Sequence, residues 1–260
     1  MKILLVGEYS RLHNSLKEGL VKLDHEVTLV STGDAFKNYP SDVLLKRKYD
    51  SGILKKIKVG LFRIFGIDIS SLALKNQFFR QKENFKGFDA VQLINESPFG
   101  ILPKYEKEII SYLKNNNKNL FLLSCGTDYT SVKYAFEKKF RYAIFDPLFE
   151  GKVSEKEFYP ALKYLKPEFE DLHHFVFNNI TSVAASDLDY AIPLQGNAKY
   201  FGLIPNPVNT EKLKFHPLSS EGKIIIFHGI NRENYFKKGN DFFEAALKII
   251  QQKHPSKVEV

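Results

Sequence analysis

KILLVGEYSRLHNSLKEGLVKLDHEVTLVS, residues 2–31, is the stretch that decides the fold of this chain. Residues 3–6 form a continuous apolar run, as in a central parallel strand that is buried on both faces. Leucines then recur at positions 12, 16, 20 and 23, the spacing of one face of a helix. Residues 26–31 supply a second apolar strand. The stretch therefore predicts a right-handed βαβ unit. The turn after the first strand holds only Gly7, so it lacks the G-x-G-x-x-G pattern of dinucleotide-binding sites.

The same pattern continues along the chain. We expect strands at residues 88–95, 120–124, 181–185 and 199–204, with helices at about 103–113 and from about 168 onward. Residues 1–205 therefore predict an α/β domain with a Rossmann-like parallel sheet. A proline-punctuated linker, 206–222, follows. Residues 223–260 then predict the start of a second Rossmann-like domain, with a strand at 223–228 and a helix from about Asn240.

The composition limits the compartment and the partners that we expect for this protein. The 260 residues are 43% hydrophobic, carry a net charge of +8 and include a single cysteine, Cys125. One cysteine excludes a disulfide framework. The N-terminal apolar run is too short for a signal peptide, and we expect a cytoplasmic protein. The positive charge favours anionic partners without choosing among them. The basic residues do not interleave with a nucleic-acid recognition motif, so we do not expect nucleic-acid binding.

Polar residues follow three of the predicted strands. These ends lie at residues 7–14, 95–97 and 126–129. Ligands of open parallel sheets bind at the carboxyl ends of the strands. Glu96, beside Asn95, and Asp128 are therefore candidate acid–base groups or hydroxyl ligands, although Asp128 is equally placed to cap a helix. His173 and His174 are adjacent and cannot share a helix face as i, i+4 metal ligands do, so we interpret them as packing or surface residues.

A basic segment lies between the predicted strands at residues 26–31 and 88–95. Residues 46–63 contain seven Lys or Arg residues and a single acid, Asp50. On a helical projection their apolar residues gather on one side. This pattern is typical either of a helix lying on anionic lipid or of a covering helix with a solvated basic back.

The loop before the last predicted helix combines the features of a diphosphate site. Gly229 ends the predicted strand, Arg232, Lys237 and Lys238 follow, and a helix begins near Asn240. A glycine turn, fixed cations and a helix N-terminus together suit a diphosphate.

Three segments together resemble the retaining GT-B-fold glycosyltransferases of family four. LDHEVTLVST, residues 23–32, is similar to the family's G-H-E-V-T strand, with Asp24 in place of glycine. LIPNPVNTEKLKF, residues 203–215, is similar to the interdomain I-P-N-G-V-D-x-x-x-F, with Pro207 and Asn209 replacing Gly and Asp. GINRENYFKKG, residues 229–239, resembles the donor loop G-R-x-x-x-x-K-G, with two extra residues before Arg232.

The resemblance implies an acceptor-binding N-terminal domain and a nucleotide-sugar-binding C-terminal domain. Arg232 and Lys238 would contact the donor diphosphate, with Gly229 allowing close backbone approach. His13 would be a candidate catalytic residue where the N-terminal loop meets the acceptor, and the loop residues Gly7, Asn14 and Asn95 would lie on the acceptor side. No metal or other cofactor is then expected, because the fixed cations serve the diphosphate.

The family's Glu-x7-Glu motif has no convincing copy here, so we expect the chain to be a fragment of a longer protein that is inactive alone. The acceptor would be a saccharide or a lipid-linked saccharide of cell-surface polysaccharide biosynthesis, the latter with peripheral contact to the inner face of the membrane. The alternatives are a GT-B-fold sugar-nucleotide epimerase and a non-catalytic protein that binds a nucleotide sugar or a partner. The continuation beyond Val260 would decide among these.

Overall fold

The computed structural model describes residues 1–34, 37–211, 214–217, 222–230 and 232–260. By contacts the chain divides into two units. Unit 1 comprises Met1–Lys133 and Lys163–Asn209, and unit 2 comprises Tyr134–Leu162 and Thr210–Val260. Residues 212–213 and 218–221 of the predicted interdomain region, and residue 231 of the predicted donor loop, lie outside the described residues.

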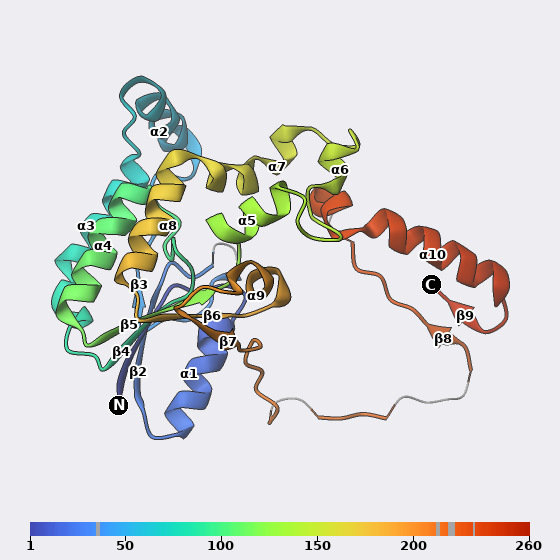
Figure 1. The fold of residues 1–260 in the computed structure, drawn as a ribbon, viewed down its shortest axis with the longest axis horizontal. Helices are drawn as coiled ribbons and strands as arrows, with labels where there is room; N and C mark the ends of the chain where they lie inside the picture. Colours follow the sequence, from blue (N-terminus) through green and yellow to red (C-terminus); the bar gives the residue numbers. More distant parts are fainter. Residues whose placement is uncertain (35–36, 212–213, 218–221, 231) are drawn as a thin grey trace. The chain divides into compact units, whose positions relative to one another are not determined.

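Unit 1 is built on a parallel sheet of seven strands in the order β3-β2-β1-β4-β5-β6-β7 (Figure 1). The strands are β1 (Lys2–Val6), β2 (Glu26–Ser31), β3 (Val43–Leu44), β4 (Ala90–Leu93), β5 (Asn119–Ser124), β6 (Ser182–Ala185) and β7 (Tyr200–Leu203). The order reverses between β1 and β4, which makes this pair the topological switch point of the sheet.

Helices cover both faces of this sheet (Figure 1). The helices of unit 1 are α1 (Leu12–Lys22), α2 (Gly52–Phe65), α3 (Ile69–Arg80), α4 (Pro103–Asn116), α5 (Tyr129–Phe136, which extends into unit 2), α8 (Pro167–Asn179) and α9 (Leu188–Leu194), with short 3-10 turns at Lys82–Phe85 and Lys163–Leu165. Of these, α2 buries none of its residues. Leu4 and Val6 pack with residues of α3, α4 and α8, whereas Ile3 and Leu5 pack with α1. This alternation follows from the two-residue period of a strand.

The predicted fold class is confirmed: the structure is α/β with a Rossmann-like parallel sheet. The second predicted strand has the bounds of β2, and α1, α4, α8, β5, β6 and β7 lie within a few residues of their predicted positions. Strand β3 and helix α3 are among the elements that the sequence analysis did not predict. Strand β3 has only two residues, and α3 alternates polar and apolar residues without a clear stripe, so neither leaves a strong periodic signal.

Asp24 adopts a backbone conformation that explains its place in the sequence pattern. Its φ is +59°, in the left-handed region, between the C-cap of α1 and the start of β2. Glycine is the usual residue at such a turn, and aspartate is one of the few others that visit it readily. The substitution of glycine by aspartate in the resembling segment is therefore compatible with the same turn.

Unit 2 contains a second βαβ arrangement. Strand β8 (Ile224–Ile225) leads through two 3-10 turns, Arg232–Asn234 and Phe236–Lys238, into α10 (Asn240–Lys253), and β9 (Val258–Glu259) returns parallel to β8. Helices α6 (Asp146–Phe149) and α7 (Glu155–Leu162) belong to the same unit. The helix predicted from about Asn240 begins at that residue, whereas the strand predicted over 223–228 is shorter. The predicted domain boundary at residue 205 stays a prediction. The two units are defined by contacts between residues, and unit 2 includes residues 134–162 from before that boundary.

Among the described residues, none of the helices has the length and apolar character needed to cross a membrane.

Candidate functional site

Gly7 lets the end of β1 pass close to the loop that follows β4. Its φ is +90°, and a Cβ at this position would lie 2.3 Å from Ile94 Cγ2 and 2.8 Å from the Pro98 carbonyl oxygen. Both the backbone conformation and the space therefore require glycine. The predicted role of Gly7 at the carboxyl edge is thus given a physical basis: it brings two strand exits together at the switch point.

The backbone beyond Gly7 is held in an uncommon conformation. Ser10 and Arg11 both have positive φ, +50° and +70°, although neither is glycine. The Ser10 N–H donates to Asp34 Oδ2 at 2.8 Å. Strained residues of this kind gather at functional loops, where surrounding contacts over-determine them.

His13 is fully buried beneath this loop rather than presented to a ligand. Its Nδ1 lies 2.7 Å from the Gly7 carbonyl oxygen and its Nε2 lies 3.3 Å from Gln92 Nε2. A carbonyl can only accept and an amide NH₂ can only donate, so the proton of the neutral ring sits on Nδ1. Burial lowers the pKa of His13 to about 4. The geometry therefore gives His13 a positioning role under the loop, which differs from the catalytic role considered from sequence.

Asn14 binds a carboxylate that sequence reasoning did not select. Its backbone N–H and its Nδ2 donate to Glu8 Oε2 at 2.8 and 2.6 Å, and Nδ2 also donates to the Pro40 carbonyl oxygen. Burial raises the pKa of Glu8. Its Oε1 is buried without a hydrogen-bond partner in the described part of the chain. Glu8 directly follows the glycine at a strand end, which was the signal available in the sequence.

Asn95 joins the ends of β4 and β5. Its Nδ2 donates to the carbonyl oxygens of Cys125 and Thr127 at 2.5 and 3.2 Å, and its Oδ1 accepts from Ser97 N–H at 2.9 Å. All polar atoms of the Asn95 side chain are therefore engaged in holding the edge. Asn95 shapes the predicted acceptor-side loop through these bonds.

The buried carboxylate of Glu96 forms a hydrogen bond with His173 of α8. Glu96 Oε1 lies 2.6 Å from His173 Nδ1, and the Tyr129 ring lies 5.0 Å from the imidazole, centroid to centroid. Burial raises the pKa of Glu96, and the contact with His173 opposes that rise. The side chain of His173 retains 12% exposure, against 4% for Glu96. His173 was interpreted from sequence as a packing or surface residue, and it packs against Tyr129 and Phe177; its contact with the candidate carboxylate, 77 residues earlier, was not predicted.

Asp128 caps helix α5. Its Oδ1 accepts from Ser131 N–H at 2.7 Å and its Oδ2 accepts from Ser124 Oγ at 2.5 Å. This is the geometry of an N-cap, in which a side-chain oxygen accepts from the third residue of the helix. Of the two interpretations that the sequence left open, the structure supports the cap.

Glu106 of α4 holds the loop after β4 from below. Its Oε1 accepts from Ser97 Oγ at 2.8 Å and from the backbone N–H groups of Phe99 and Ile101 at 3.2 and 3.1 Å. The side chain is fully buried, and burial raises its pKa to about 7 although Arg47 opposes that rise. Sequence reasoning missed it because a glutamate in the first turn of a helix is common and usually solvated.

The predicted donor loop lines a pocket within unit 2. The pocket has a volume of about 380 Å³ and is lined by Val153, Glu157, Arg232, Asn234, Tyr235, Phe236 and Lys237. Lys237 Nζ donates to the Glu157 carbonyl oxygen at 2.5 Å. Arg232 thus lines the pocket, and its predicted contact with a diphosphate stays a prediction. Lys238 and Gly229 do not line it, and the second cation among its lining residues is Lys237.

The start of α10 is fixed by residues of the same loop. Asn240 Nδ2 donates to the Tyr235 carbonyl oxygen at 2.9 Å, and Asn240 Oδ1 lies 2.8 Å from His228 Nε2. The His228 ring also packs on Phe243, at 4.4 Å between centroids. These contacts connect the strand exit, the cationic turns and the helix N-terminus into one local structure.

Comparison with known proteins adds only distant structural similarity. No family model matches the chain, and no curated protein matches it. The 3-alpha-hydroxysteroid dehydrogenase from Pseudomonas sp. B-0831, solved in complex with NADH, shares 10% identity with this chain, over 71% of it and 77% of the dehydrogenase, with a TM-score of 0.34. A similarity of this size carries no inference about ligand or activity.

Proposed function

We propose that this chain belongs to a retaining glycosyltransferase. The enzyme would move a sugar from a nucleotide-diphosphate donor to a hydroxyl of a saccharide or lipid-linked saccharide in cell-surface polysaccharide biosynthesis. Unit 2 would bind the donor diphosphate and unit 1 the acceptor. The observation that carries the proposal is the loop between β8 and α10, where Arg232 and Lys237 line one pocket directly ahead of a helix N-terminus.

The chemistry of the leaving group explains why cations belong there. As the glycosidic bond breaks, negative charge grows on the departing nucleoside diphosphate. Cations that bind this charge more strongly in the transition state than in the ground state accelerate the reaction. Arg232 offers a bidentate fork for two phosphate oxygens, and Lys237 offers a compact charge held by its bond to the Glu157 carbonyl. The helix dipole of α10 adds to the positive potential of this loop.

On the acceptor side, the proposal assigns Glu96 and His173 to an acceptor hydroxyl. Asp128 is committed to capping α5 and His13 to the Gly7 carbonyl, whereas His173 keeps part of its ring exposed. A histidine paired with a buried carboxylate can accept a hydrogen bond or a proton from a hydroxyl, and the carboxylate stabilises the charge that results. Glu96 would thus orient and support His173 rather than touch the acceptor itself.

The donor assignment is tested by mapping nucleotide binding along the backbone. A panel of nucleoside diphosphates would be titrated into isotope-labelled protein, and amide chemical shifts followed by NMR. We expect changes gathered in residues 229–241 with one of the nucleotides, and none with the matching nucleosides. Shift changes confined to the ends of β1, β4 and β5 would instead place a nucleotide in unit 1 and overturn the assignment.

A further inference from the structure

Helix α2 leaves its apolar side uncovered. None of its 14 residues is buried in unit 1. Ile53 and Ile64 are 75% and 74% exposed, and Phe65 is 64% exposed. Leu54, Ile57, Val59 and Phe62 are exposed as well, followed by Ile67 just beyond the helix. An amphipathic helix of a globular protein ordinarily buries such a stripe against the core. The interpretation as a covering helix, which the sequence left open, is therefore not supported.

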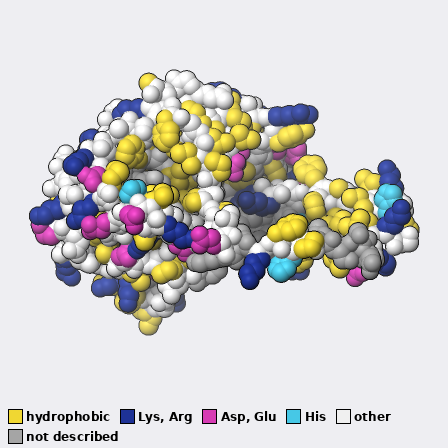
Figure 2. All heavy atoms as spheres, turned by 90° about the horizontal axis from the view of Figure 1, so that it is seen from below, with side chains coloured by type: hydrophobic (Ala, Val, Ile, Leu, Met, Phe, Trp, Pro, Cys, Tyr) yellow, Lys and Arg dark blue, Asp and Glu magenta, His cyan; other side chains and the backbone are white. Residues whose placement is uncertain are grey.

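The polar side of α2 carries cations alone. Lys55, Lys56, Lys58 and Arg63 are the charged residues of the helix, and no acid lies within it. The segment before it adds Lys46, Arg47 and Lys48 against Asp50. Elsewhere on unit 1, Figure 2 shows Lys and Arg side chains interspersed with Asp and Glu side chains over one face. Positive charge and exposed apolar surface are thus concentrated together at α2.

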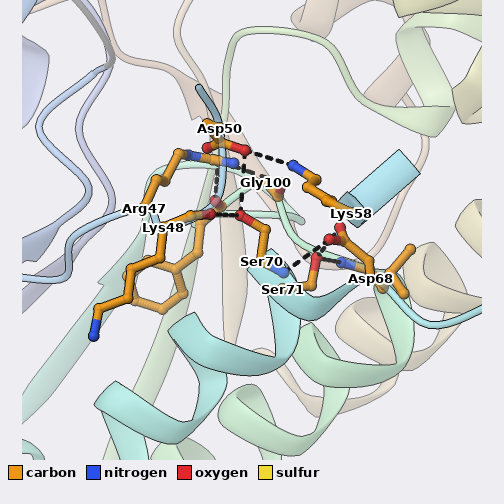
Figure 3. A network of polar contacts seen from close by, with 10 residues as sticks. Arg47, Lys48, Asp50, Lys58, Asp68, Ser70, Ser71 and Gly100 are labelled. Atoms are coloured by element: carbon orange, nitrogen blue, oxygen red, sulfur yellow. Dashed lines mark hydrogen bonds and ion pairs between the residues drawn. The ribbon is translucent and has the colours of Figure 1, made fainter. Parts of the chain in front are cut away.

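Contacts at its base hold α2 in place (Figure 3). Lys58 Nζ donates to Asp50 Oδ1 at 2.5 Å, and Ser70 Oγ of α3 donates to the same carboxylate at 3.3 Å and to the Lys48 carbonyl oxygen at 2.5 Å. Asp68, between the two helices, caps α3 by accepting from Ser70 N–H at 3.0 Å. The apolar side is therefore presented by an anchored helix, with Asp50 joining α2 to α3.

The base of α2 is also joined to the candidate acceptor edge. Arg47, between β3 and α2, donates through Nη2 to the carbonyl oxygens of Phe99 and Gly100 at 2.6 and 3.4 Å. Those two residues lie in the loop after β4 that Glu106 holds from the other side. A surface that bound α2 would therefore lie next to the loop that follows the switch-point strand.

We propose that α2 docks unit 1 on an anionic lipid surface. Its Ile, Leu and Phe side chains enter the boundary between headgroups and acyl chains, and Lys55, Lys56 and Arg63 contact anionic headgroups, whereas Lys58 stays paired with Asp50. Charge distinguishes lipid from a second copy of the chain. A two-fold contact through the apolar side of α2 would bring two helices of the same positive charge close together, with no acid on either helix to offset their repulsion. This docking goes beyond the proposed function and does not depend on donor binding.

Vesicle sedimentation tests the proposal directly. Vesicles of equal parts phosphatidylglycerol and phosphatidylcholine should sediment the protein at about 50 mM salt and release much of it at about 500 mM, because salt screens the cations. Vesicles of phosphatidylcholine alone should retain far less. Equal retention by both kinds of vesicle, or by neither, would overturn the proposal.

Matched variants then separate lipid docking from other occupants of this surface. The double variant Ile53→Glu/Ile64→Glu should abolish sedimentation, whereas Leu188→Glu, at an exposed position of α9, should leave it unchanged. Lys56→Glu should weaken binding at least about fivefold, and Lys104→Glu on α4 should not. Circular dichroism of each variant confirms the fold.

Light scattering measures the particle mass and so tests whether α2 binds a second copy of the chain. The proposal expects a particle mass that the double variant does not change. A dimer that Ile53→Glu/Ile64→Glu converts to monomer, without lipid binding by the parent chain, would assign the surface to a second copy and overturn the proposal.

Discussion

The fully buried carboxyl of Glu106 makes the stability of unit 1 depend on pH in a defined direction. Its pKa is about 7 in the folded protein against an ordinary value of 4.5. The folded state therefore holds this proton more tightly than the unfolded state. The stabilisation is complete below pH 4.5 and is lost as the pH rises through 7. The difference of about 2.5 pKa units corresponds to about 3 kcal/mol of unfolding free energy.

Glu106→Gln removes the titration and keeps the acceptor. The three donors, from Ser97, Phe99 and Ile101, all bind Oε1, which a glutamine amide oxygen can replace. The amide NH₂ would take the position of Oε2, which has no hydrogen-bond partner in the described part of the chain. We therefore expect the stability of the variant relative to the parent to rise by about 3 kcal/mol between pH 4 and pH 8.

Urea unfolding followed by circular dichroism at pH 4, 6 and 8 measures this difference. With a slope of about 2 kcal/mol per M, the variant should gain about 1.5 M in midpoint over the parent at pH 8 compared with pH 4. Glu108→Gln, two residues on at an exposed position of the same helix, is the control and should show no comparable trend. A Glu106→Gln effect that is constant with pH, or that grows toward acid, would refute the reasoning.

Three further outcomes follow from buried groups of unit 1. Gly7→Ala should destabilise the protein by at least about 2 kcal/mol, because the added Cβ would clash with Ile94. Gly19→Ala, whose Cβ would lie in open space on α1, should stabilise the protein by about 0.5–1 kcal/mol. Thermal unfolding of the two variants measures the difference. The His13 imidazole should titrate near pH 4 by NMR, and a midpoint at 6.5 would contradict its burial. The Cys125 thiol, whose pKa burial raises to about 12, should react with a disulfide reagent only after unfolding, and rapid labelling of the folded protein would count against this.

Short-range patterns in the sequence were sufficient for much of the fold. The β1–α1–β2 unit follows from an apolar run, a leucine stripe and a turn at Asp24, all within about 30 residues. Gly7 and Asn95 were selected because polar or glycine residues at strand ends recur at the edge of a parallel sheet. These features depend on neighbouring residues, so they are readable without the tertiary structure.

The partners across the fold were not predictable in the same way. Glu96 contacts His173 only because α8 packs against α4, which places His173 near the end of β4. Glu106 is buried because the loop of residues 97–101 folds over it, and nothing in a helix sequence signals that.

The choice between Lys237 and Lys238 depends on the 3-10 turn that contains them. Successive residues in such a turn point about 120° apart. Only one of two adjacent lysines can then face a given pocket, and the spacing in the sequence does not say which.

Calorimetry of nucleoside diphosphate binding tests the central claim most directly. The proposal predicts that Arg232→Ala abolishes measurable binding, while Arg141→Ala, which removes the same charge from another position of unit 2, leaves it unchanged. Equal affinity of the Arg232→Ala variant and the parent would contradict the assignment of the pocket between β8 and α10 to a donor diphosphate.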